Sequence, residues 1–139
     1  MVHHWIFVLY PFSDFSRGNA DETLLKLKMS NKWPVGKRTP NRKDLSKGDK
    51  ALFYLAGKDG QKFIGSAELL SDLQISENNY CDFVVLKTMK LWKNPTFIKE
   101  LVNSLSFISN KNHYGCSLQG GIVKIPESDY ALISSKAKK

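Results

Sequence analysis

The sequence predicts an α+β fold, built on a small curved mixed sheet or β-barrel with helices packed at its openings. Strand-like segments follow one another closely, without the regular strand–helix–strand alternation of a parallel α/β sheet. We expect the element order β-α-β-β-β-α-β-α. The length of 139 residues suits one domain with a substantial core, so residues 1–139 are expected to form a single domain.

The first predicted strand, His4 to Tyr10, is apolar on both of its alternating faces. Such a segment is typical of a strand that is buried on both sides of its sheet. A short helix is expected over Asp21 to Met29, because acidic residues begin it and leucines recur at helical spacing. Trp33 and Pro34 should end that helix in a turn, since the residue before a proline avoids the helical region.

Two strand patterns around a glycine-containing loop predict a hairpin in the middle of the chain. The strands are expected over Ala51 to Ala56 and Lys62 to Leu70, with the loop over Gly57 to Gly60. Ahead of them, Lys47-Gly48-Asp49 is typical of a turn. The pattern therefore predicts two paired strands that a turn separates from the preceding basic segment.

A further strand is expected over Phe83 to Leu91. On a regular strand, side chains alternate between the two faces, so Lys87 and Lys90 should point to opposite sides. Pro95 follows, and we expect it to open a helix over Thr96 to Val102.

The last part of the chain predicts one more strand and one more helix. The strand is expected over Ile122 to Ile125, and Pro126 then begins the helix at a position where proline is favoured. Tyr130 and Ile133 should lie on one face of that helix. We expect residues 134–139 to form a flexible basic tail.

The chain is basic, with a net charge of +8 and a pI of about 9.5. This charge favours an acidic partner such as nucleic acid. No stretch approaches the roughly 20 apolar residues that span a bilayer, and the N-terminal residues lack the pattern of a secretory signal. We therefore expect a cytoplasmic protein that does not bind membranes, with Cys81 and Cys116 as reduced thiols.

Motifs of catalysis and metal binding are missing from the sequence. There is no nucleophile elbow, no paired-histidine zinc motif and no glycine loop of the kind that holds phosphates. His113 lies three residues before Cys116, and this pair leaves a thiol–imidazole enzyme as an alternative. One histidine and one cysteine do not make a zinc site. We expect a non-catalytic protein without metal or cofactor.

Trp33 is the strongest candidate for a binding residue. A flat aromatic face beside positive charge suits the stacking of one planar base and the binding of its phosphates. The segment that follows Trp33 carries six cations and two aspartates, a net charge of +4: Lys37, Arg38, Arg42, Lys43, Lys47 and Lys50, with Asp44 and Asp49. The alternative is a core tryptophan that closes one end of the barrel. As a pocket wall, Trp33 should be removable with little loss of stability.

Six segments, in this order and spacing, resemble the EVE domain of the compact archaeal and bacterial type, within the PUA-like superfamily. They are His4 to Val8, Asn31 to Val35, Lys47 to Tyr54, Phe63 to Glu68, Leu105 to Lys111 with His113-Tyr114-Gly115, and Ile125 to Tyr130. The hairpin between Phe53 and Glu68 also resembles the YTH domains, which bind methylated adenine in RNA. The resemblance covers nearly the whole chain.

This resemblance implies a PUA-like barrel with a pocket at one end for a single modified base, and a basic surface beside it. EVE domains are linked to modified cytosine in DNA, and the wider superfamily to RNA. Trp33 matches the tryptophan that walls the YTH pocket after the first helix. A second cage tryptophan has no match, because Trp5 lies on the first strand and Trp92 lies beside a predicted strand end.

We therefore expect a module that binds a modified, and in particular a methylated, base in DNA or RNA. The expected base pocket comprises Trp33, Pro34, Val35, Tyr10, Leu55, Ala56 and Tyr114. The expected phosphate-binding residues are Lys37, Arg38, Arg42 and Lys43. A sensor domain for a small molecule such as a free nucleoside is the alternative from another class. It predicts a closed pocket and binding that salt does not affect.

Overall fold

The structure, a computed structural model, describes residues 2–9, 31–35, 42–55, 61–75, 82–108 and 122–136. Its strands are β1 (His4–Leu9), β2 (Lys32–Val35), β3 (Lys50–Leu55), β4 (Lys62–Leu69), β5 (Asp82–Phe97) and β6 (Ile122–Ile125). Its helices are the 3-10 turns η2 (Arg42–Asp44) and η3 (Ile98–Glu100) and the α-helix α2 (Glu127–Lys136). The helix expected over Asp21 to Met29 lies outside the described residues.

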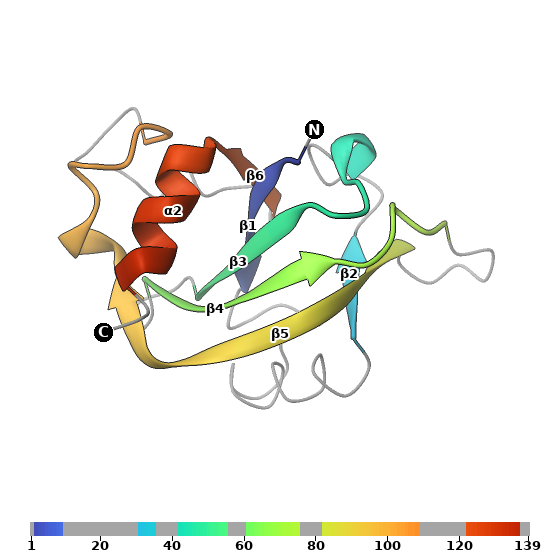
Figure 1. Ribbon diagram of the computed structural model, residues 1–139, viewed down its shortest axis with the longest axis horizontal. Coiled ribbons are helices and arrows are strands. Elements are labelled where there is room, and N and C mark those ends of the chain that lie inside the picture. Colours follow the sequence, from blue (N-terminus) through green and yellow to red (C-terminus); the bar gives the residue numbers. More distant parts are fainter. Residues whose placement is uncertain are drawn as a thin grey trace.

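The strands form one mixed sheet in the order β2-β5-β4-β3-β1-β6 (Figure 1). β1 runs parallel to β3 and antiparallel to β6, and the other neighbouring strands are antiparallel. The sheet curls into a half-barrel, and β5 bows along its length (Figure 1). The predicted α+β class, with its curved mixed sheet, is confirmed.

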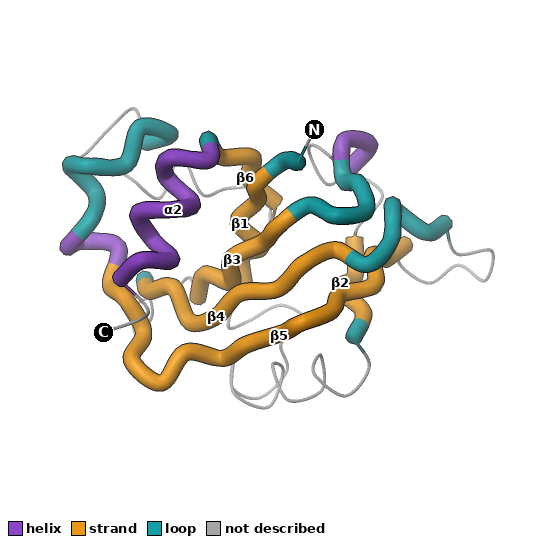
Figure 2. The backbone as a smooth tube through the Cα atoms, viewed as in Figure 1, coloured by secondary structure: helices purple, strands orange, loops and turns teal. Residues whose placement is uncertain are grey.

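The C-terminal helix α2 covers one end of the sheet. It lies beside β1 and β3, on the side where η3 follows β5 (Figure 2). Ile133 is fully buried on its inner face. The helix continues to Lys136, so the prediction of a flexible tail is wrong for residues 134–136. Residues 137–139 lie outside the described part. No helix within the described ranges is long and apolar enough to cross a membrane.

Both faces of the central strands are buried, as the pattern of the first strand predicts. Side chains at odd positions of β1 and β3 contribute to one core, namely Trp5, Phe7, Ala51 and Phe53. Side chains at even positions contribute to the opposite core, namely Ile6, Val8, Leu52 and Tyr54. The second core also contains Ile133, so this is the face that α2 covers. The sheet therefore separates two apolar layers.

Asp49 joins the start of β1 to the turn before β3. Its buried carboxylate accepts hydrogen bonds from the Trp5 Nε1 at 2.8 Å, the His3 amide at 3.0 Å and the Ser46 amide at 3.0 Å. Gly48 adopts a φ of 92°, a conformation that glycine tolerates at little cost. The turn predicted at Lys47-Gly48-Asp49 is therefore present, and Asp49 stabilises it through charge-assisted hydrogen bonds.

β2 occupies the segment where the sequence predicts a turn. Trp33 and Pro34 pair with Val84 and Phe83 of β5, and β2 lies at the edge of the sheet. An edge strand tolerates proline because one side of its backbone needs no ladder hydrogen bond. Proline therefore excludes a continuing helix here, but it does not exclude this strand.

β5 also differs from expectation, because it continues through Pro95 to Phe97 where a helix is predicted. The pairing with β4 is interrupted at this point. Phe63 pairs with Thr96 and Gly65 pairs with Leu91, so Pro95 lies in a bulged stretch of β5. A proline without an amide hydrogen fits such an interruption, and the strand then turns into η3 rather than a longer helix.

Gly65 allows β4 and β5 to approach each other closely. A Cβ at this position would lie 2.5 Å from the Lys90 carbonyl oxygen and 3.3 Å from side-chain atoms of Leu91 and Phe53. The nearest obstacle is backbone, which cannot move aside as a flexible side chain can. The glycine is therefore required by the packing of these two strands.

We expect Gly65→Ala to lower the free energy of unfolding by about 1–3 kcal/mol, because the added methyl group overpacks the sheet. Urea denaturation followed by circular dichroism measures the change. Ser66→Ala, a truncation at the neighbouring half-buried position, is the control and should cost less. Equal stability of Gly65→Ala and wild type would contradict the close approach.

Candidate functional site

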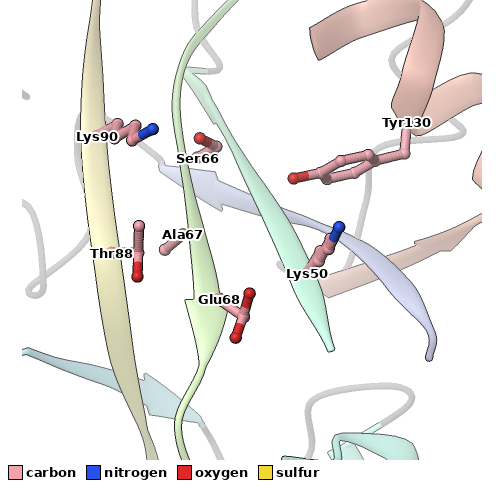
Figure 3. Close-up of a pocket in the computed structure, with 7 residues that line it drawn as sticks. All are labelled: Lys50, Ser66, Ala67, Glu68, Thr88, Lys90 and Tyr130. Carbon is pink, nitrogen blue, oxygen red and sulfur yellow. The ribbon is translucent and has the colours of Figure 1, made fainter. Parts of the chain in front are cut away.

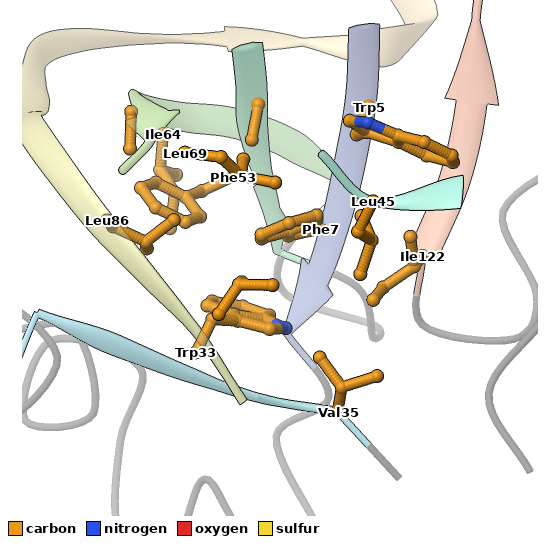
Figure 4. Packing of buried hydrophobic residues seen from close by; sticks show 13 residues of the cluster. Trp5, Phe7, Trp33, Val35, Leu45, Phe53, Ile64, Leu69, Leu86 and Ile122 are labelled. Atoms are coloured by element: carbon orange, nitrogen blue, oxygen red, sulfur yellow. The ribbon is translucent and has the colours of Figure 1, made fainter. Parts of the chain in front are cut away.

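Trp33 lies in a cluster of three aromatic rings. Its indole stacks on Phe53, with ring centroids 5.4 Å apart and an interplanar angle of 22°. Phe7 packs against the same indole at 5.0 Å, tilted by 36°. Figure 4 shows Trp33 beneath Phe7, beside the end of β1. The three rings come from β1, β2 and β3, so the pairing of distant strands creates this cluster.

The cluster lies where β1 and β3 end. Leu9 pairs with Leu55 at the last position of these two parallel strands, so both chains leave the sheet side by side. Leu55 is partly buried and packs against the cluster that contains Trp33. Tyr10 and Ala56, the next residues of the expected pocket, lie outside the described residues, as does Tyr114. The expected pocket segments thus include two strand ends that are neighbours in space.

The exposure of Trp33 differs from that of an open stacking platform. Its exposed fraction is 3%, and that of Val35 is 1%. The backbone of Pro34 lies in β2 between them, paired with Phe83. The packing of Trp33 is thus that of a core residue, the alternative weighed from the sequence. The role of Trp33 as a wall for a bound base stays a prediction.

Part of the expected cationic rim is tied to the same cluster. Lys43 is exposed on η2, whose backbone begins at Arg42. Two residues later, Leu45 is buried in the core that contains Trp33. Lys37 and Arg38 lie outside the described residues. Among the expected phosphate-binding residues, the structure describes the side chain of Lys43, and that side chain is exposed. Leu45 anchors the segment of Lys43 to the aromatic core.

Asp129 is a structural residue whose role the sequence analysis did not identify. Its buried carboxylate accepts hydrogen bonds from the Ser106 amide and hydroxyl, both at 3.0 Å, and from the Phe107 amide at 2.9 Å. It thereby joins α2 to the segment that leads along the chain to Tyr114. The sequence shows an aspartate three residues after Pro126. Its hydrogen-bond partners lie more than 20 residues away, so the local pattern does not reveal them.

The described residues contain no group of three or more histidine, cysteine, aspartate or glutamate side chains that could hold a metal ion. The thiol–imidazole pair considered from the sequence, His113 and Cys116, lies outside the described residues.

Comparison with known proteins assigns the family. The family model described as the EVE domain matches residues 4–136. The chain belongs to the EVE domain family. The resemblance inferred from the sequence motifs is thereby confirmed over nearly the whole chain. No curated protein matches it.

Solved structures share the fold of this EVE domain at low sequence identity. Rpa0253 from Rhodopseudomonas palustris matches with a TM-score of 0.68 and 15% identity, covering 99% of this chain and 94% of that one. Human THYN1, solved in complex with DNA containing 5-methylcytosine, matches with a TM-score of 0.67 and 13% identity. The match covers 99% of this chain and 98% of THYN1. The YTH domain-containing protein mmi1, solved with RNA, matches with a TM-score of 0.59 and 15% identity. The match covers 98% of this chain and 81% of mmi1. The similarity extends to the YTH fold, as the hairpin motif suggested.

We expect Trp33→Ala to lower the free energy of unfolding by about 3–5 kcal/mol, because it removes a buried ring and leaves a cavity beside Phe7 and Phe53. This replaces the expectation of a small loss that exposure would have implied. Chemical denaturation measures the effect. Lys43→Ala, at an exposed position, is the control and should change stability by less than about 0.5 kcal/mol. If Trp33→Ala lost no more stability than Lys43→Ala, the indole would not be packed as described.

Proposed function

We propose that this EVE domain is a non-catalytic nucleic-acid-binding module that accepts one modified base at the Trp33 cluster. The observation that carries the proposal is membership of the EVE family, together with a shared fold over 99% of the chain with THYN1, solved in complex with 5-methylcytosine DNA. The basic charge of the chain supports a polyanionic partner.

The geometry of the cluster constrains how a base could enter. Phe53 and Phe7 both pack against the Trp33 indole, so a base would have to use the part of the ring that they leave, toward the ends of β1 and β3. With 3% of Trp33 exposed, entry requires the groups that cover it to move aside. Extrusion of a base from a duplex costs a further few kcal/mol, least at a mismatched or single-stranded site. We therefore propose that single-stranded or distorted sites bind best.

The first test compares oligonucleotides that carry cytosine, 5-methylcytosine or 5-hydroxymethylcytosine in the same sequence. We expect tighter binding of a modified form by wild type. Trp33→Phe keeps an aromatic ring in the core but shortens the stacking surface, so it should weaken that binding by about 1 kcal/mol. Fluorescence anisotropy at two salt concentrations measures the affinities.

Trp5→Phe is the matched control, because Trp5 is also a fully buried tryptophan of the same core but donates its indole hydrogen to Asp49 instead. It should leave the ratio between modified and plain oligonucleotides unchanged. Equal affinity of wild type for all three oligonucleotides would refute modified-base recognition for cytosine. Tight binding of a free nucleoside that salt does not affect would instead support the small-molecule sensor.

The second test concerns Lys43. If it contacts a phosphate, Lys43→Gln should weaken binding to every sequence alike and reduce the slope of log K against log salt by about 0.7 for single strands. Binding measured over a salt series gives the slope. An unchanged slope would remove Lys43 from the interface without affecting the proposal for Trp33.

A further inference from the structure

A bulge in β5 collects basic side chains on one face of the sheet. Ser66 pairs with Lys90 and Glu68 pairs with Lys87, so two residues of β5 oppose one residue of β4 between these pairs. Thr88 lies in the extra stretch with a φ of 52°. Ser66 and Glu68, two positions apart, share a face, and their partners Lys90 and Lys87 therefore lie on that same face. The expectation that these lysines point to opposite sides was wrong because of this bulge.

The shared face is the one that α2 covers, opposite the Trp33 cluster. Leu52, the partner of Ser66 on β3, belongs to the core under α2. Lys50, two residues before Leu52, pairs with Glu68. The lysines at 50, 87 and 90 thus approach the same part of β4 from both neighbouring strands.

Part of this face is hollowed into an open polar cavity of about 180 Å³. Figure 3 shows Lys90 extending from β5 toward Ser66, while the Tyr130 hydroxyl points from α2 toward the same strand. The lining consists of Lys50, Ser66, Ala67, Glu68, Thr88, Lys90 and Tyr130. One water molecule needs roughly 10–15 Å³ of such space, so the cavity is large enough for a polyatomic ligand.

The charge of the cavity is positive. Lys87 Nζ lies 3.1 Å from Glu68 Oε2 and balances that carboxylate. Lys50 and Lys90 then leave a net charge of +2 around the cavity. Burial lowers the pKa of His4, although the Glu127 charge opposes the shift, so this imidazole beside the Tyr130 ring is neutral at neutral pH and adds no charge.

Hydroxyl groups complete the set of donors. Burial, reinforced by the charge of Glu68, raises the pKa of Tyr130, so its hydroxyl stays protonated at neutral pH and can donate a hydrogen bond. Ser66 and Thr88 bring two more hydroxyls to the lining. Two ammonium groups and three hydroxyls around one cavity match a tetrahedral oxyanion, because each of its oxygens can accept a charge-assisted or neutral hydrogen bond.

We propose that this cavity, between β3, β4, β5 and α2, binds a phosphate group. The site is separate from the Trp33 cluster, on the other face of the sheet, and it does not depend on base recognition there. The phosphate belongs either to the backbone of a bound nucleic acid or to a free phosphate or phosphate monoester.

The test begins with inorganic phosphate, titrated into the full chain at constant ionic strength, with sodium chloride and acetate as control salts. Backbone amide shifts of Ser66 and Thr88 in NMR spectra report binding. Lys50→Gln and Lys90→Gln should each weaken binding about tenfold, the loss expected for one charge-assisted hydrogen bond. Glu68→Gln should strengthen binding up to about fivefold, because it removes a nearby negative charge.

Lys99→Gln is the matched control, since it removes one exposed positive charge from η3, outside the cavity lining. It should leave phosphate binding within twofold of wild type. Shifts that chloride or acetate reproduce, or equal weakening by Lys99→Gln, Lys50→Gln and Lys90→Gln, would overturn the proposal. Because no base is present, this result is independent of the test of modified-base binding.

A second arm identifies the source of the phosphate. Binding of an unmodified single strand is measured over a salt series for the Lys50→Gln/Lys90→Gln double variant and for Lys99→Gln. A slope reduced by about 0.7 in the double variant alone assigns the cavity to a nucleic-acid phosphate. Equal slopes, with the phosphate shifts retained in wild type, support a free phosphate or monoester as the ligand.

Discussion

Burial of β1 and β3 on both faces is the constraint on which the rest of this EVE domain depends. These two parallel strands bring apolar side chains to two cores at once, Trp5 and Phe7 on one side and Ile6 and Val8 on the other. Buried strands of this kind leave no surface for a ligand along their length. Binding sites must therefore lie at the strand ends or over β4 and β5, where the sheet becomes more polar.

The Trp33 cluster would combine core packing with the base recognition proposed above. Its indole stacks on Phe53 in the core and belongs to an edge strand. A ring held in this way has a fixed orientation, which would lower the entropic cost of binding the proposed base. The same packing links stability to any movement that uncovers the ring, so a variant that weakens the core also changes the free energy of opening.

Much of the fold could be predicted from the sequence, because its signals are local. The apolar pattern of β1, the hairpin strands, the turn at Gly48 and Pro126 before α2 each depend on neighbouring residues. The errors arise where a distant partner decides the outcome. Pro34 is accommodated by an edge strand and Pro95 by a bulge, and neither partner lies nearby in sequence. For the site, the sequence pointed to Trp33 but did not predict its burial against Phe53. The sheet brings these two rings together across 20 residues of sequence.

The pairing of β1 with β6 has a consequence for the order of folding. His4 lies opposite Ile125, so the first strand of the described chain obtains its second neighbour more than 110 residues later. Such distant contacts raise the contact order and slow the search for the native state. During synthesis one side of β1 must stay unpaired until β6 emerges, and an open strand edge is prone to intermolecular pairing. The pairing of β1 with β6 thus determines how long this edge is open to other chains.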